Sequence, residues 1–273
     1  MAKTPAGTYV YCLIASARKP VLERMPAGLA GMGRVRLLDT EARGAVKTPR
    51  SGCLNKWLAV ADAPLSRYGE ETINSRLSDL DWVSRAAVAH EAVVEAFIDA
   101  TAVLPMKLFT IFTNDERALE HLRGEQGRIN AVLKRVAHHR EWCVRVVLDR
   151  ARATVGKRAV ANAAARGGQS GIGYLARKKA QRDAAAELAG RASDTVAHLY
   201  DLLAGQASVS KRRAPGELPV TGGPLLLDAA FLVPATRSVR FRSLAAREAS
   251  TLDREGYRVT LSGPWPAYSF VQD

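Results

Sequence analysis

The sequence predicts an α+β protein of two domains: a ferredoxin-like (βαββαβ) domain at residues 1–140 and a modified βαβαβ domain at residues 141–273. Short β-branched and aromatic runs alternate with stretches of helical periodicity along the whole chain. The chain has 273 residues, of which 47% are apolar. That length and composition allow a buried core in each of about two domains.

The first domain is expected to contain strands and helices in the ferredoxin-like order. Aromatic and β-branched runs predict strands at residues 9–15, 35–38, 54–61 and 104–112. A short helix is expected near residues 20–29. The clearest helix carries apolar residues at steps of three and four from Val83 to Thr101, with Asp81 placed to cap its N-terminus. This order gives two interlocked βαβ halves and one antiparallel sheet.

A further helix is expected to follow the first sheet and to join the two domains. Thr113 and Glu116 have the spacing of a capping box. Its apolar stripe consists of Leu119, Leu122, Ile129, Leu133 and Val136.

The second domain is expected to have the order βαβαβ. The predicted strands cover residues 142–148, 225–233 and 257–261, and the predicted helices cover residues 174–203 and 239–255. The Gly- and Pro-containing residues 211–224 are expected to form a loop.

The positive charge is concentrated in the second domain. The chain has 40 Lys and Arg against 27 Asp and Glu, a net charge of +13. Residues 151–213 contain twelve basic and four acidic side chains, which is eight of those thirteen charges. Four cations crowd the first turns of the long helix, the end where the helix dipole disfavours them: Arg177, Lys178, Lys179 and Arg182. We expect this segment to bind an acidic protein surface, and a nucleic-acid-binding protein is the alternative.

No motif in the sequence indicates catalysis, a cofactor or a metal. His90-Glu91 begins like a zinc protease motif, but Val94 occupies the position of the second histidine, so His90 is expected to be a hydrogen-bonded core residue. The glycines at residues 167–173 match neither a dinucleotide fingerprint nor a P-loop. The third strand lacks the aromatic RNA-binding pattern, which argues against nucleic acid. We therefore expect a non-enzymatic protein without cofactors.

The location is expected to be cytoplasmic. No apolar run approaches the length of a membrane span, and the N-terminus begins with a strand-like run instead of a signal peptide. The cysteines, Cys12, Cys53 and Cys143, lie far apart within apolar runs and are expected to be buried free thiols.

The final segment, LSGPWPAYSFVQD, is the most unusual local sequence. Pro264 and Pro266 are expected to fix an extended conformation around Trp265, with Tyr268 and Phe270 following on a stiff, non-helical tail. Rigid aromatic side chains are favoured both in cores and at interface hot spots. The tail is thus a candidate partner-binding element, and packing onto its own domain is the equal alternative.

The same segment closely resembles the end of the gas vesicle GvpL/GvpF family, Leu-Thr-Gly-Pro-Trp-Pro-Pro-Tyr-Ser-Phe-Val, from which only Ser262 and Ala267 depart. The segment from Val88 to Phe112 resembles the family's His-Glu helix and the strand Leu-Pro-Leu-Arg-Phe-Gly-Thr that follows it. Further similar segments are Tyr9–Tyr11, Glu141–Asp149, Gly173–Lys179 and Ala229–Pro234. The resemblance covers nearly the full length.

The resemblance implies a non-enzymatic accessory protein of gas vesicle assembly. Members of this family are thought to bind the hydrophobic shell protein GvpA and to support nucleation or growth of the shell, as chaperone-like or minor shell-associated components. Other gas vesicle accessory proteins are further expected partners, whereas a membrane and nucleic acid are not. A shell subunit that forms a water-excluding wall would aggregate unless its apolar or edge surfaces were masked before assembly.

Overall fold

The structure is a computed structural model that describes residues 6–41, 54–149, 171–214 and 223–271. The chain forms two compact units. Residues up to Arg140 and those from Trp265 onward belong to the first unit, and Glu141–Pro264 form the second. The sequence-based division had placed residues 265–273 in the second domain, whereas the described residues 265–271 lie in the first unit.

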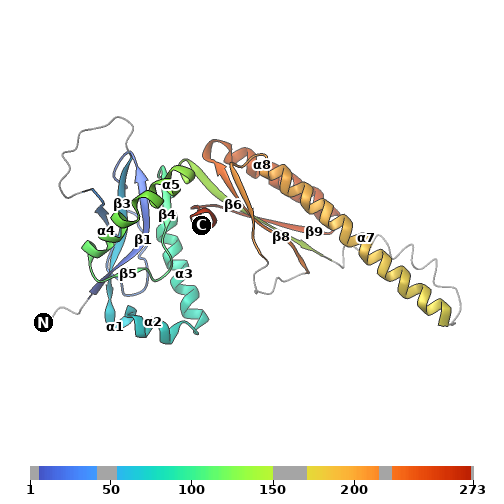
Figure 1. Ribbon diagram of the computed structural model, residues 1–273, viewed down its shortest axis with the longest axis horizontal. Helices are drawn as coiled ribbons and strands as arrows, with labels where there is room; N and C mark the ends of the chain where they lie inside the picture. Colours follow the sequence, from blue (N-terminus) through green and yellow to red (C-terminus); the bar gives the residue numbers. More distant parts are fainter. Residues whose placement is uncertain (1–5, 42–53, 150–170, 215–222, 272–273) are drawn as a thin grey trace. The chain divides into compact units, whose positions relative to one another are not determined.

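The first sheet is built around β1 (Ala6–Ser16), and its strand order is β2-β3-β1-β4 (Figure 1). Strands β3 (Asn55–Pro64) and β4 (Ala102–Pro105) pair antiparallel with β1, and β2 (Arg36–Asp39) pairs antiparallel with β3. The two-residue strand β5 (Ile111–Phe112) pairs with Thr8 and Tyr9 on the same edge of β1 as β4. The strand expected at residues 104–112 is therefore divided in two, and Pro105 ends its first part.

The helix expected near residues 20–29 is absent, and this prediction was wrong. The segment contains Pro20 and Pro26, and Gly28 has a positive φ of 70°, so helical hydrogen bonding cannot continue through it. A side chain fixes its end instead, because the Leu29 N–H donates to the Tyr11 hydroxyl at 3.2 Å. Irregular chain thus connects β1 to β2.

Helices α1 (Leu65–Tyr68), α2 (Glu70–Arg76) and α3 (Leu80–Glu95) follow β3. The buried side chains of α3 pack with Tyr9, Tyr11 and Ile14 on one face of the sheet. The N-cap of α3 is Asp79 and not the predicted Asp81, because the Asp79 carboxylate accepts from the Trp82 N–H at 3.0 Å. Asp81 lies inside the first turn, where an acidic residue complements the helix dipole.

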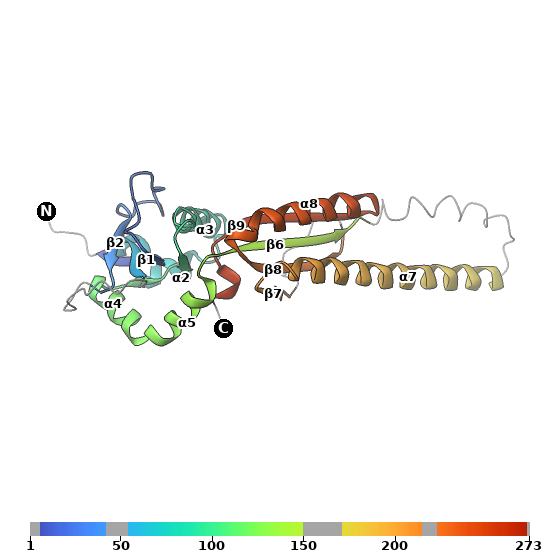
Figure 2. The same cartoon turned by 90° about the horizontal axis from the view of Figure 1, so that it is seen from above.

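The opposite face of the first sheet is covered by α4 (Asp115–Gly124) and α5 (Gln126–Val136), as Figures 1 and 2 show. Leu13 of β1 points to this side and lines a small cavity with Leu122 and Ile129. One linker helix had been expected here, but the helix breaks at Glu125 and both parts belong to the first unit. Asn114, one residue after the predicted cap Thr113, accepts from the Arg117 N–H at 2.9 Å.

The second sheet has the strand order β7-β8-β6-β9. Its elements follow the chain as β6 (His139–Leu148), α7 (Gly171–Ala204), β7 (Val209–Arg212), β8 (Leu225–Pro234), α8 (Ser238–Arg254) and β9 (Tyr257–Trp265). Short 3-10 turns cover Ala235–Arg237 in this unit and Tyr268–Phe270 in the first unit. The predicted βαβαβ order lacked β7, which pairs antiparallel with β8 and overlaps only the first two residues of the segment expected to be a loop.

Both long helices of the second unit pack on one face of its sheet. The core joins alternate residues of β6 (Trp142, Val144, Val146 and Leu148) to residues of α7, β8 and α8. Arg145 belongs to the other face of β6, where its Nε donates to the Asp228 carboxylate at 3.1 Å. Arg213 donates to the same carboxylate through Nε at 2.9 Å. This face of β6 is thus partly polar.

Candidate partner-binding surfaces

The predicted basic helix is present as α7, and its cationic end is exposed. Its C-terminal half packs through Ala192, Val196, Leu199 and Leu203. The four predicted cations, Arg177, Lys178, Lys179 and Arg182, are all exposed. Figures 1 and 2 show that the N-terminal part of α7 extends beyond the end of the second sheet.

This exposed part of α7 combines positive charge with apolar surface. Tyr174 is 58% exposed and Leu175 is 65% exposed, directly before the four cations. Within the described parts of the chain, none of these cations forms an ion pair. A helix surface of this kind suits a partner that offers both carboxylates and an apolar contact. We call residues 174–182 the basic segment.

The aromatic tail packs largely into the first unit. Trp265 ends β9 in the predicted extended conformation, but Tyr268 and Phe270 lie in a 3-10 turn, so the expectation of a non-helical tail was wrong for these two residues. Phe270 is 4% exposed, and its carbonyl accepts a hydrogen bond from Arg135 Nη2 at 2.6 Å. Tyr268 packs against the core that β1 and α3 form. The three aromatic side chains therefore do not form one exposed patch.

His90 is a buried, hydrogen-bonded residue, as the sequence predicted. It is 4% exposed, and its Nδ1 lies 2.7 Å from the Tyr9 hydroxyl. Burial lowers the pKa of His90 to about 4, and the nearby Met106 backbone opposes that shift. The described residues contain no group of three or more His, Cys, Asp or Glu able to hold a metal ion.

The cysteines Cys12 and Cys143 are free and buried, as expected. Burial raises the pKa of Cys143 to about 12 and raises that of Cys12 further. Both thiols are therefore protonated at neutral pH and chemically inert. The third cysteine, Cys53, and most of the glycine-rich stretch at residues 167–173 lie outside the described residues.

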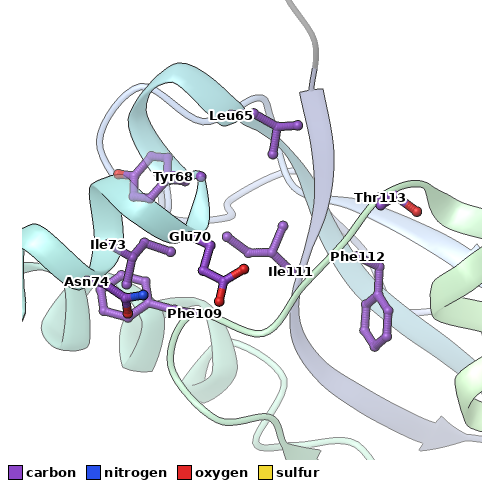
Figure 3. A pocket seen from close by; sticks show the side chains of 10 residues that line it. Leu65, Tyr68, Glu70, Ile73, Asn74, Phe109, Ile111, Phe112 and Thr113 are labelled. Atoms are coloured by element: carbon purple, nitrogen blue, oxygen red, sulfur yellow. The ribbon is translucent and has the colours of Figure 1, made fainter.

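The first unit also contains an apolar cavity of about 410 Å³ that the sequence had not indicated (Figure 3). Its walls come from two separate parts of the chain: the consecutive helices α1 and α2, and the segment that includes β5. The lining residues are Leu65, Tyr68, Gly69, Glu70, Ile73, Asn74, Phe109, Ile111, Phe112 and Thr113. We call this cavity the β5 groove.

Phe109 gives the β5 groove part of its aromatic surface and has an unusual backbone. Its φ is 64°, a left-handed conformation that favours glycine. Its ring stacks on Trp82 with centroids 4.9 Å apart, and its N–H donates to the Tyr9 hydroxyl at 3.4 Å. No local pattern in the sequence had singled out Phe109.

A larger cavity, of about 800 Å³, lies between α7 and β8 in the second unit. Leu188, Val196 and Leu226 are among its apolar walls. Leu148 and Pro224 also line it.

Comparison with known proteins gives one consistent result. Residues 7–272 match the family model of the gas vesicle synthesis protein GvpL/GvpF. Gas vesicle protein L of Streptomyces sp. (strain CB03234) is 31% identical over 210 residues, which cover 76% of this chain and 77% of that protein. No helix within the described ranges is long and apolar enough to cross a membrane.

Two solved structures have the same fold at low sequence identity. GvpF from Anabaena sp. PCC7120 matches with a TM-score of 0.66 and 15% identity, covering 98% of this chain and 97% of that one. GvpF from Microcystis aeruginosa matches with a TM-score of 0.63 and 13% identity, covering 98% and 99%. The α+β architecture with two sheets is thus shared with these proteins.

Proposed function

This chain belongs to the gas vesicle GvpL/GvpF family and has a role in gas vesicle assembly, and we propose that it performs this role by binding the shell protein GvpA. In this proposal it supports nucleation or growth of the shell, as a chaperone-like or minor shell-associated component. Other gas vesicle accessory proteins are further proposed partners. The protein acts by masking apolar or edge surfaces of the subunit until these are incorporated.

The observation that carries the proposal is the exposed basic segment of α7. The four cations form no ion pair with any residue that the structure describes, and they lie next to exposed Tyr174 and Leu175. This surface lies outside the core cluster of its own unit. Such charges increase the rate of encounter with an acidic partner, and the apolar pair adds contact area once the partner has docked. We propose that this segment is a binding site for gas vesicle proteins.

The test is co-purification of GvpA with the tagged full-length chain from cells that express both. Reversing the charge of Arg177, Lys178, Lys179 and Arg182 should reduce the recovered GvpA about tenfold at low salt, because the attraction is electrostatic. The matched control reverses four exposed cations of the same unit: Arg237, Arg240, Arg242 and Arg254. Both variants should keep the wild-type thermal midpoint.

The outcomes separate the parts of the proposal. Equal loss with both variants would show a general charge effect and no specific site on α7. Unchanged recovery with the α7 variant, at low and at physiological salt, would show that the basic segment is only a solvated surface. If wild-type protein recovers no GvpA, the proposed function is wrong.

The aromatic tail is tested by the double change Trp265→Ala and Tyr268→Ala. Since Tyr268 packs against the core of the first unit, we expect a lower thermal midpoint. Any effect on binding is measured at a temperature where both proteins remain folded. Reduced GvpA recovery there would assign the tail to partner recognition, and unchanged recovery would assign it to the core alone.

A further inference from the structure

The strand β5 has one paired and one unpaired edge. The Val10 N–H donates to the Thr110 carbonyl at 2.9 Å, and Phe112 lies opposite Thr8. Ile111, opposite Tyr9, therefore occupies the position between two hydrogen-bonded pairs. At such a position in an antiparallel ladder, the main-chain N–H and C=O point away from the paired strand. Among the described residues, none hydrogen-bonds the main chain of Ile111 on that side.

The unpaired edge of β5 belongs to the β5 groove. Ile111 and Thr113 line this groove from one side, and Leu65 and Ile73 line it from α1 and α2 (Figure 3). Leu65 is 36% exposed, and Phe109 supplies aromatic surface beside Ile111. The groove thus combines unsatisfied main-chain groups with apolar walls, which are the two features that strand addition requires.

The negative charge of Glu70 indicates which kind of segment the groove would bind. Glu70 is exposed at the start of α2 and lines the groove, and it forms no ion pair with any described residue. A single unpaired carboxylate beside an apolar surface is complementary to a Lys or Arg on the segment that enters. The adjacent Glu71 is also exposed but does not line the groove.

We propose that the β5 groove binds an extended apolar segment of the unassembled shell subunit, which adds as a strand to the edge of β5. Its main chain hydrogen-bonds Ile111, and alternate side chains contact Leu65, Ile73 and Phe109. A Lys or Arg of the same segment pairs with Glu70. The proposal rests on the proposed function. In it, the groove of the first unit masks the subunit, and the basic segment of α7 makes a second, separate contact.

The test uses fluorescein-labelled 15-residue peptides that tile the GvpA sequence, titrated with the full-length chain. We expect one peptide, apolar and containing Lys or Arg, to bind. Glu70→Lys should weaken its binding at least about tenfold, and Leu65→Asp should do the same. The matched control Glu71→Lys changes the charge equally in the same helical turn and should bind like wild type. Ile111→Pro, which removes an N–H that faces away from β1, should also weaken binding.

The results also separate this inference from the proposed function. Equal peptide affinity for wild type, Glu70→Lys and Leu65→Asp would overturn the groove proposal. Capture of intact GvpA without any peptide binding, unaffected by these two changes, would overturn it as well and leave the proposed function standing. If wild type binds neither peptides nor intact GvpA, both proposals are wrong. Glu70 and Leu65 are exposed, so their variants remain informative if Ile111→Pro lowers the thermal midpoint.

Discussion

The two units have the same strand order and differ in what connects their strands. In β2-β3-β1-β4 and in β7-β8-β6-β9, the first strand of the unit lies between the third and the fourth. The first connection of the first unit is irregular, whereas that of the second unit contains the 34-residue helix α7. The same strand order is therefore compatible with connections of different length and secondary structure. Both proposed binding surfaces include such connecting segments.

The sheets also differ in how they are covered. Helices lie on both faces of the first sheet, and β1 is accordingly a nearly unbroken buried run. The second sheet has α7 and α8 on one face, and β6 carries Arg145 within its otherwise buried sequence. Ala230 and Leu232, on the face of β8 turned away from these helices, are nevertheless fully buried. The contribution of each core to stability can be tested by substitution.

The largest expected effect is that of Phe231→Ala in the second unit. Phe231 is fully buried, and its ring lies 5.6 Å from Tyr200 and 5.5 Å from Phe241, measured between centroids. Removing it should cost about 3–5 kcal/mol of the free energy of unfolding, because the cavity cannot be refilled. Hydrogen exchange should show loss of protection in β6 and β8 with β1 unchanged. Equal loss in β1 would show that the two cores unfold as one.

The next effect concerns His90 in the first unit and depends on pH. Its pKa is lowered to about 4 by burial, from 6.5 in the unfolded chain. Between these values the unfolded chain binds more protons, so stability rises with pH and reaches its full value above about pH 6.5. Across this pH range, His90 should raise the free energy of unfolding by roughly 3 kcal/mol. This increase should disappear in His90→Leu, as measured by denaturant unfolding from pH 4 to pH 7.

The stability of His90→Leu at neutral pH depends on the Tyr9 hydroxyl. That hydroxyl loses the His90 ring nitrogen at 2.7 Å and keeps only the longer contact with the Phe109 N–H at 3.4 Å, so the variant should be destabilised at pH 7 by about 1–3 kcal/mol. Measuring the loss in free energy of unfolding of Phe231→Ala at the same pH compares the effect of a core substitution in each unit. An unchanged pH dependence in His90→Leu would show that another group causes it.

Most of the strands and long helices were predictable because each depends on a local pattern. The runs at β1, β3, β6 and β8 are apolar and β-branched, and the helices α3, α7 and α8 show helical periods. The strand β7, Val-Ser-Lys-Arg, is largely exposed and carries little apolar signal, so only its pairing with β8 reveals it. The helix expected near residue 20 failed because two prolines and the positive φ of Gly28 outweighed a weak apolar period.

The candidate site was only partly predictable. Exposure of the four cations of α7 follows from their position outside the apolar stripe. The β5 groove could not be predicted, because Leu65 and Glu70 meet Phe109 only in the folded chain. The same holds for Arg36, which pairs with Asp62 at 2.7 Å and with Asp115 at 2.8 Å, residues that lie far from it in sequence. Long-range contacts of this kind leave no periodic signal.

The smallest expected effect is that of Gly190→Ala in α7. Gly190 lies inside the helix, between Leu188 and Ala192, which both pack on the core, and a Cβ added there would meet no described atom within 4 Å. Alanine should therefore stabilise the second unit by about 1 kcal/mol, the usual difference between these residues in a helix interior. Gly127, in the first turn of α5, has the same free space and serves as the matched control in the first unit.

Chemical denaturation of both glycine variants measures the difference. Gly127→Ala should change stability less, because the first turn contributes fewer hydrogen bonds to the helix. If Gly190→Ala stabilises the protein while GvpA recovery is unchanged, a straight, rigid α7 is the form that binds. If the same variant is more stable but recovers less GvpA, binding requires α7 to bend at Gly190. In that case the basic segment and the packed half of α7 act as separate parts.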